Sequence, residues 1–390
     1  MDPERFKDSP AGRLMRIGQG KATYWAFLPN PLPPSLELSR ELVCTLSAAD
    51  RALGELAGLG RSLANPHLLI NPFIRREAVL SSRIEGTQAS IADLYAYEAG
   101  QLPLPGLAET GAEDVREVAN YVHALEYALG RLDTLPVSLR LLREVHRRLM
   151  LGVRGEHSTP GEFRTSQNWI GSPGCTLNEA TYVPPPVDEM HEALGALELY
   201  LHVEDDPFPP LVRLAFIHYQ FEAIHPFLDG NGRIGRLLVS LLLVHWGLLP
   251  LPLLYLSAYF EAHRDDYYRL LLAVSERGAW ATWVRFFLQG VAEQARDAVV
   301  RAKRLQDLQL EWRERLSQAR VSALSLRLLD ALFTTPFVTI PQAQALLEVT
   351  YVSAQRCVYR LVEAGILRQY TDGSYARTFV ADEILTAVGT

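Results

Sequence analysis

The segment at residues 225–236, with the sequence HPFLDGNGRIGR, carries residue types that could bind and activate a phosphate-containing substrate. Gly230 and Gly232 permit tight backbone turns close to a ligand. A helix that begins within this segment would present its free backbone N–H groups to an anion. Arg233 and Arg236 are three positions apart, so both guanidinium groups project from one side of the first helical turn.

The charges of this segment favour the same chemistry. Two cations at a helix N-terminus oppose the helix dipole by roughly 0.3–1 kcal/mol each, which suggests an anionic ligand that offsets the cost. Asp229 would add a hard oxygen ligand for Mg²⁺ beside the phosphates, and His225 could exchange a proton near neutral pH. Alone, each residue has an ordinary structural explanation as a cap, a turn or a solvated surface, but their joint occurrence predicts a phosphate site.

Two apolar helices are expected to position this segment. The first, at residues 212–224, should end at His225, because the residue before a proline is pushed out of the α region. The second begins near Asn231 and continues into an uncharged stretch of 24 residues, 237–260. Length alone would admit a transmembrane helix. The break in the sequence WGLLPLP predicts instead two buried core elements and no membrane span.

Composition limits the class of protein. The chain has 390 residues, of which 48% are hydrophobic and 21% charged, which indicates a soluble globular protein of two or three domains. The net charge of -7 argues against nucleic-acid binding over the whole surface. Three widely separated cysteines form no metal-binding spacing and no disulfide framework, and the charged N-terminus resembles no signal peptide. We therefore expect a cytoplasmic protein.

The remaining pattern is mostly helical. Turn residues at 29–34 predict an irregular entry segment, and residues 153–187, rich in Gly, Pro and Asn, predict a β-hairpin from short pieces at 168–170 and 180–183. Residues 291–318 predict a long, charge-laced helix that serves as a connector more than as core. Further helices are expected at residues 37–61, 73–85, 90–97, 115–129, 138–150 and, with breaks, from 187 onward.

The last seventy residues predict a separate unit. Three helices, at 323–333, 339–348 and 352–364, precede a hairpin with its turn at Asp372 and Gly373, which is the order of a winged helix. Residues 320–390 hold six arginines, six acidic residues and no lysine. Phosphate contacts dominate DNA affinity, so DNA binding is less favoured for this neutral unit than protein contact or dimer packing.

The segment HPFLDGNGRIGR matches without a gap the signature HxFx(D/E)GNGRxxR of the Fic family, whose members transfer AMP from ATP to a protein hydroxyl. The sequence PGEFR at 160–164, followed by WIG at 169–171, resembles the family's lead-in to its flap hairpin, and TYVPPP at 181–186 resembles the flap's end. The resemblance covers about residues 20–300. It implies a mainly α fold, in which a Fic helical core with a small β-hairpin flap is followed by the winged-helix domain.

The resemblance also implies a role for each position. His225 would be the general base that takes a proton from the target Ser, Thr or Tyr hydroxyl, and Asp229 would hold Mg²⁺ on the phosphates of ATP. The flap would bind the target protein by strand addition. The implied phosphate ligands are Gly230, Asn231 and Gly232, which form the anion hole, with Arg233 and Arg236 as clamps; the implied flap residues are Thr181, Tyr182 and Val183.

A second motif lies at residues 81–86, with the sequence SSRIEG. Ser81 and Glu85 are four apart and share one face of the predicted helix. The segment fits the family's inhibitory motif (S/T)xxxE(G/N), placed N-terminal to the signature. By that resemblance Glu85 pairs with Arg236, which then cannot hold the γ-phosphate, and ATP binds unproductively. Some members use this Glu to remove AMP from their targets, and the sequence leaves that alternative open.

These expectations divide the chain into four parts. They are an N-terminal helical region at 1–110 with an inhibitory helix near 73–86, a catalytic core at 111–300 with the flap near 168–186, a connector helix at 301–322 and a winged-helix domain at 323–390. The main alternative is a winged-helix transcriptional regulator whose core only senses nucleotide, and another donor than ATP is a further one. The target, the modified residue, self-modification and homodimer formation stay open.

Overall fold

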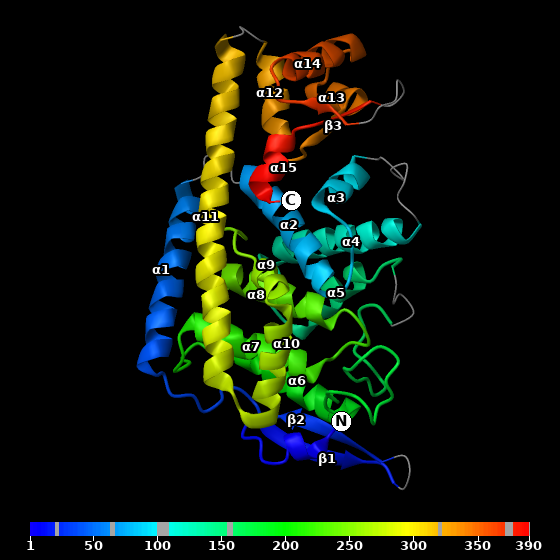
Figure 1. Cartoon of the computed structure of the whole chain (residues 1–390), viewed down its shortest axis with the longest axis vertical. Coiled ribbons are helices and arrows are strands. Elements are labelled where there is room, and N and C mark those ends of the chain that lie inside the picture. Colours follow the sequence, from blue (N-terminus) through cyan, green and yellow to red (C-terminus); the bar gives the residue numbers. More distant parts are fainter. Residues whose placement is uncertain are drawn as a thin grey trace.

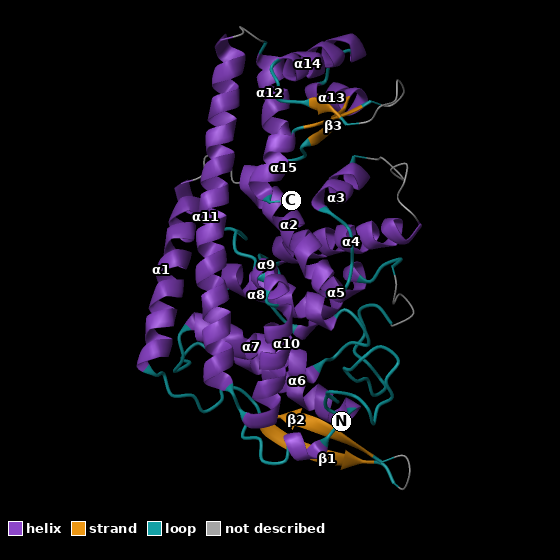
Figure 2. Cartoon of the chain, viewed as in Figure 1, coloured by secondary structure: helices purple, strands orange, loops and turns teal. Residues whose placement is uncertain are grey.

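Helices make up most of the chain in the computed structural model, which describes residues 1–19, 23–62, 67–99, 109–153, 159–318, 322–370 and 377–389. Figure 1 shows an elongated molecule with a long helix along one side, the helical core beside it and the C-terminal elements at one end. The strands of the described residues lie toward the two ends of the long axis in this view (Figure 2). The mainly α fold expected from the sequence is therefore confirmed.

Two apolar helices occupy the centre of the core. They are α7, Pro210–Ile224, and α8, Asn231–His245, and nearly every residue of both is buried. A helix that is apolar on all sides must be surrounded by other helices. The helices that pack against them include α4, Glu109–Arg131, α5, Leu139–Leu149, α6, Val187–Leu201, and α10, Arg264–Arg277. The short helix α9, Ser257–Ala262, packs against α10.

The apolar stretch at residues 237–260 divides as expected. Its first part belongs to α8, a loop follows, and its last part belongs to α9. Among the residues that the structure describes, no helix is both long enough and apolar enough to cross a membrane.

The long helix α11, Trp280–Gln318, is part of the core rather than a separate connector. It packs along α1, Arg40–Ser62, and buries Leu305, Leu308 and Trp312 in the region expected to be a linker. Gly290 does not break the helix. A Cβ there would lie 2.7 Å from the Tyr259 ring, so the glycine lets α9 approach closely.

The N-terminal segment forms a β-hairpin that was not predicted from the sequence. After a short 3₁₀ helix, Pro3–Arg5, strand β1, Gly12–Ile17, pairs antiparallel with β2, Tyr24–Pro29. The Phe27 N–H donates to the Val183 carbonyl at 2.9 Å, so the hairpin covers the end of the predicted flap. The irregular segment expected at residues 29–34 follows β2, which ends at Pro29, and the hairpin before it was not expected.

Helix α2, His67–Ile84, carries the second motif. It begins earlier than the expected residue 73, because Pro72 is accommodated inside the helix near its start. Glu85 and Gly86 form the turn that follows, and Gly86 has a positive φ of 104°, which favours glycine. Helix α3, Ile91–Glu98, then begins with a capping box at Ser90.

The C-terminal elements extend beyond the expected helices and hairpin. Strands β3, β5 and β4 form an antiparallel sheet in that order, and the final helix and β3 were not expected. The expected turn at Asp372 and Gly373 lies outside the described residues. The elements are α12, Ala323–Leu332, β3, Phe337–Thr339, α13, Ile340–Leu347, α14, Tyr351–Glu363, β4, Arg368–Gln369, β5, Thr378–Val380, and α15, Asp382–Val388.

Candidate functional site

The loop between α7 and α8 is folded by its own side chains. His225 ends α7 in the left-handed region, with φ 50° and ψ 60°. The Asn231 amide accepts from the Phe227 N–H at 2.8 Å and donates to the Phe227 carbonyl at 2.8 Å. The Asn231 side chain therefore shapes the loop, and its backbone N–H, in the first turn of α8, is available to contact an anion. Gly230, with φ 76°, is the N-cap of α8.

Two buried arginines project from the first turns of α8. Arg233 is 4% exposed and Arg236 is 3% exposed. Within the described part of the chain, the Arg233 Nε and the Arg236 Nη1 are buried without a hydrogen-bond partner. An unpaired buried donor of this kind is costly. These two unpaired N–H groups, beside a helix N-terminus, make a cradle that fits phosphate oxygens.

Arg233 is held from three sides. Its Nη1 lies 3.5 Å from Oε2 of Glu117 on α4, and its Nη2 lies 3.6 Å from the sulfur of Met150 and 3.9 Å from Oδ1 of Asp229. The Glu117 carboxylate also accepts from the Thr87 hydroxyl at 3.4 Å, in the segment after Glu85. The arginine is thus linked to the turn that follows α2.

Arg236 contacts the second motif directly. Its Nη2 lies 2.7 Å from Oε1 of Glu85 and donates to the Ser81 carbonyl at 2.9 Å, and its Nε donates to the Ser81 hydroxyl at 2.9 Å. Burial alone would raise the pKa of Glu85, but the Arg236 guanidinium outweighs burial and holds it below its ordinary value. The predicted pairing of Glu85 with Arg236 is therefore present in the structure.

Glu85 also occupies space beside the loop. Its side chain is 35% exposed, so it lies at the edge of the cradle rather than in the core. A Cβ on Gly232 would lie 2.3 Å from Oε1 of Glu85. The glycine at this position thus lets a carboxylate approach the helix backbone closely.

His225 is poised to accept a proton. Its Nδ1 lies 3.3 Å from the Glu222 carbonyl, which assigns the ring proton to Nδ1 and leaves the Nε2 lone pair free. Burial lowers the pKa of His225 to about 4. The imidazole is therefore neutral near pH 7, which is the form that a general base requires.

Two residues that the sequence reading did not assign hold the His225 backbone. Arg164 is buried and its Nε donates to the His225 carbonyl at 3.0 Å. The Asn168 amide donates to the same carbonyl at 3.3 Å and to the Phe227 carbonyl at 2.8 Å. The arginine in a Pro- and Gly-rich loop was the signal in the sequence that could have indicated this role, since such a cation, once buried, must find several acceptors.

Asp229 suits a metal that is only partly held by protein. Its side chain is 50% exposed, and Oδ1 accepts from the Gly230 N–H at 2.6 Å. No group of three or more His, Cys, Asp or Glu side chains that could hold a metal occurs in the described ranges. Mg²⁺ is commonly bound by one or two carboxylates, substrate phosphates and water, so Asp229 fits that role.

The predicted flap has fewer backbone pairs between its two sides than a regular hairpin. A single antiparallel bridge joins Ile170 and Tyr182. Tyr182 and Val183 are buried, with the Tyr182 hydroxyl donating to the Ala223 carbonyl at 2.9 Å. Their side chains are anchors, and of the three predicted flap residues only Thr181 is exposed. Exposed apolar side chains near the loop are Trp169, Ile170 and Leu228.

Comparison with known proteins adds two family matches. Residues 43–130 match the model of the Fic/DOC family N-terminal region, and residues 136–243 match that of the Fic/DOC family itself. The chain is 29% identical over 209 residues to a protein of Aedes aegypti named Protein adenylyltransferase Fic, which covers 52% of this chain and 37% of the mosquito protein. A protein of the same name from Drosophila grimshawi is 28% identical over 208 residues, which cover 52% of this chain and 38% of that protein.

The chain thus spans less than two fifths of the length of these curated relatives. Solved structures share the fold. A Fic family protein from Desulfovibrio desulfuricans G20 superposes with a TM-score of 0.56 at 21% identity and covers 90% of this chain and 98% of its own. A fragment of Fic-1 from C. elegans gives a TM-score of 0.51 at 22% identity and covers 68% of this chain and 74% of its own.

Proposed function

Because the chain belongs to the Fic/DOC family, we propose that it transfers AMP from ATP to a Ser, Thr or Tyr hydroxyl of a target protein. The reaction depends on Mg²⁺ and is restrained by Glu85. The observation that carries the proposal is the cradle at the start of α8, where two buried guanidinium groups have N–H donors without partners in the described residues. A neutral histidine lies at its edge.

The cradle supplies what phosphoryl chemistry needs most. Transfer of a phosphoryl or nucleotidyl group depends on positioning and on neutralising charge more than on covalent help from the protein. Arg233 and Arg236 bind the phosphate oxygens, and the first backbone N–H groups of α8 add further donors. Asp229 is the residue that would hold Mg²⁺, which when bound neutralises charge on the phosphates.

His225 accounts for the fate of the proton. The acceptor hydroxyl oxygen forms a bond to the α-phosphorus, and the bond from that phosphorus to the oxygen bridging the β-phosphate breaks. Pyrophosphate leaves, and the hydroxyl proton passes to the free Nε2 of His225. The Nδ1 contact with the Glu222 carbonyl keeps the ring in the required tautomer.

Glu85 accounts for the restraint. With Glu85 bound to it, Arg236 has a carboxylate where the terminal phosphate of ATP would need a donor. Two like charges 4 Å apart repel by about 4 kcal/mol at an effective dielectric near 20. ATP therefore binds in a pose that does not present its α-phosphate to the acceptor.

The test is incorporation of AMP labelled on its α-phosphate into protein in a lysate from the source organism. The Glu85→Gly protein should label targets or itself, and His225→Ala in the same background should lower the rate by about 10²–10⁴-fold while still binding ATP. Absence of label in every protein tested would reject transfer of AMP. Label retained within a few-fold in the His225→Ala protein would reject the base.

A further inference from the structure

His146 lies between the loop and the start of the flap, and the reaction as described above does not use it. It is on α5 and fully buried. Its Nδ1 accepts from the Gly161 N–H at 2.8 Å, and its Nε2 lies 3.0 Å from the Asp229 carbonyl. Both ring nitrogens are therefore engaged, one on each side of the site.

The two contacts fix the protonation state of the ring. A backbone N–H can only donate, so Nδ1 of His146 must carry the lone pair and the ring proton must be on Nε2, which donates to the Asp229 carbonyl. A protonated ring could not accept the Gly161 N–H.

The ring also sets the position of the loop by packing. It stacks on Phe227, with centroids 3.8 Å apart and an angle of 6° between the rings. A Cβ on Gly230 would lie 3.4 Å from Nε2 of His146 and 3.1 Å from the Met150 sulfur. The peptide from Asp229 to Gly230 thus has little room to move away from the imidazole.

We infer that His146 is a positioning residue, which holds the Asp229–Gly230 peptide and the flap lead-in at Gly161 in one fixed relation. This inference rests on the proposed function for its effect on rate. It requires no contact between His146 and the substrate. Loss of the ring would let the peptide rotate and misalign the Asp229 side chain and the N-cap of α8.

Three substitutions separate hydrogen bonding from packing. His146→Gln places an amide where Nε2 was and keeps the donor to Asp229. His146→Asn keeps an acceptor for Gly161 and loses that donor. His146→Phe keeps a ring on Phe227 and loses both hydrogen bonds. Each is made in the Glu85→Gly protein and measured for melting temperature, ATP affinity by calorimetry and initial rate of AMP transfer.

The Gln variant should stay within about fivefold of its parent in kcat, while the Phe and Asn variants should lose about tenfold or more, with a smaller change in KM. A Phe variant as active as the parent, or a Gln variant no better than Phe, would overturn the inference. If Phe does not fold, the comparison of Gln with Asn decides in the same way. If the parent Glu85→Gly protein transfers no AMP, the proposed function is rejected. The role of His146 is then tested by ATP affinity, which should be higher in the parent and the Gln variant than in the Phe and Asn variants.

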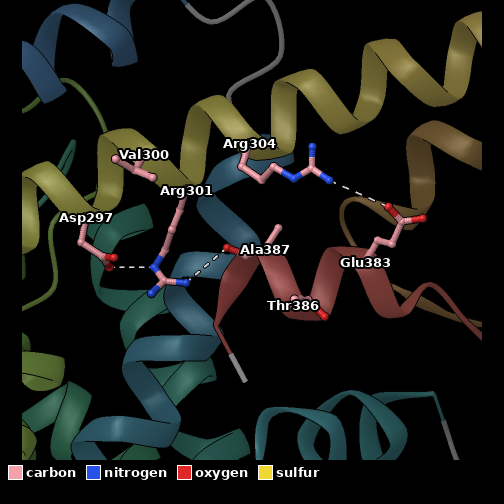
Figure 3. Close-up of a pocket in the computed structure, with 7 residues that line it drawn as sticks. All are labelled: Asp297, Val300, Arg301, Arg304, Glu383, Thr386 and Ala387. Carbon is pink, nitrogen blue, oxygen red and sulfur yellow. Dashed lines mark hydrogen bonds and ion pairs between the residues drawn. The ribbon is translucent and has the colours of Figure 1, made fainter.

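An independent set of contacts joins the C-terminal elements to the helix that carries Glu85. Asp297 on α11 lies 3.5 Å from Nη2 of Arg76 on α2 and 2.7 Å from Nε of Arg301. Nη1 of Arg301 donates to the Ala387 carbonyl of α15 at 3.3 Å. Figure 3 shows Asp297, Arg301 and Ala387 side by side in the cleft between α11 and α15.

The segment after Glu85 is held by the same elements. The Tyr95 ring of α3 stacks on Phe337 of β3 with centroids 6.3 Å apart. The Gln342 amide donates to the Ala99 carbonyl at 3.1 Å. Figure 1 shows α2 and α3 beside the C-terminal elements. The turn that contains Glu85 thus lies between two helices, each of which contacts α11 or the C-terminal elements.

We propose that the C-terminal elements α12 to α15 keep α2 and α3 in the position that brings Glu85 to Arg236. This regulation rests on the proposed function. Asp297 lies between two guanidinium groups, so its charge is what holds them together. Anything that separates α15 from α2 should release Arg236 and raise AMP transfer.

Asp297→Asn removes that charge without changing the size of the side chain. The matched control is Glu55→Gln, which breaks an exposed contact of 3.5 Å between α1 and Lys303 of the same helix α11. Asp297→Asn should raise the rate of AMP transfer about three- to tenfold in the wild-type background, while Glu55→Gln should not. In the Glu85→Gly background neither should raise it further.

A rate unchanged by Asp297→Asn would overturn the proposal. So would an increase of equal size in the Glu85→Gly background, because the effect would then not pass through Glu85. If no variant of the chain transfers AMP, the proposed function has failed. The contact itself is then tested by hydrogen exchange, which should be faster in α2 of Asp297→Asn than of Glu55→Gln.

Discussion

At the scale of single residues, the site depends on groups whose charge is set by burial. His225 is neutral because burial lowers its pKa to about 4. Arg236 is buried, which disfavours its charge, but Glu85 outweighs burial and keeps the pKa of the guanidinium above its ordinary value. A neutral imidazole and a fully charged guanidinium, which the proposed reaction needs, are thus available at the same pH.

The pH dependence of the reaction should report His225. The neutral ring is the active form, so kcat/KM should rise with pH through about 4 and remain flat from about pH 5 to 8. The measurement is the initial rate of AMP transfer by the Glu85→Gly protein, which lacks the neighbouring carboxylate, with folding monitored by circular dichroism. A fall of about threefold between pH 7 and 6 would show a base of ordinary pKa, near 6.5.

Asp229 should control the requirement for Mg²⁺. Asp229→Asn keeps an oxygen to accept from the Gly230 N–H and removes the charge. The Mg²⁺ concentration that gives half the maximal rate should rise about tenfold or more, measured at constant ATP. An unchanged Mg²⁺ titration would assign the metal to other ligands.

At the scale of elements, α2 is placed by a carboxylate about two turns before Glu85. Glu77 is buried and accepts from the hydroxyl groups of Tyr121 and Ser257, at 3.2 Å and 2.5 Å. Burial raises the pKa of Glu77 to about 7, against the lowering effect of these hydrogen bonds. The docking of α2 therefore includes a group that titrates near neutrality.

Stability should depend on pH through this residue. The folded pKa is above the ordinary value of 4.5, so the contribution of Glu77 to stability is complete below about 4.5 and is lost as the pH rises through about 7. Glu77→Gln does not titrate, so its free energy of unfolding should improve relative to wild type between pH 5 and pH 8. Urea unfolding at both values tests this, with the exposed Glu192→Gln as control. A difference independent of pH would contradict it.

The elements whose signals are local could be predicted from the sequence. The loop, the start of α8 and the motif at the end of α2 were found because their residues are close in sequence. Arg164, Asn168 and His146 were not assigned because their contacts with the loop span 61, 57 and 83 residues. The N-terminal hairpin was missed because Arg13 and Arg16 interrupt the alternation that marks a strand.

At the scale of the whole molecule, the site is assembled from distant parts of the chain. The proposed phosphate cradle comes from the α7–α8 loop, Glu85 from the turn after α2, and the contacts with α2 proposed to hold it from α11 and α15. The connector helix expected at residues 301–322 is, in the described residues, the end of α11, which runs unbroken from Trp280 to Gln318. The continuous helix lets the C-terminal elements contact α2 directly.

The central claim is that Glu85 restrains the enzyme through Arg236. The most direct measurement is the initial rate of AMP incorporation for wild type, Glu85→Gly, Arg236→Ala and the double mutant, with Glu85→Gln as a variant that removes only the charge. Both Glu85 variants should exceed wild type by about tenfold or more, which corresponds to about 1.4 kcal/mol. Arg236→Ala should fall below wild type, and the double mutant should lose the gain. Equal rates for wild type and both Glu85 variants would show that the contact between Glu85 and Arg236 is structural only. An active double mutant would show that the restraint does not pass through Arg236.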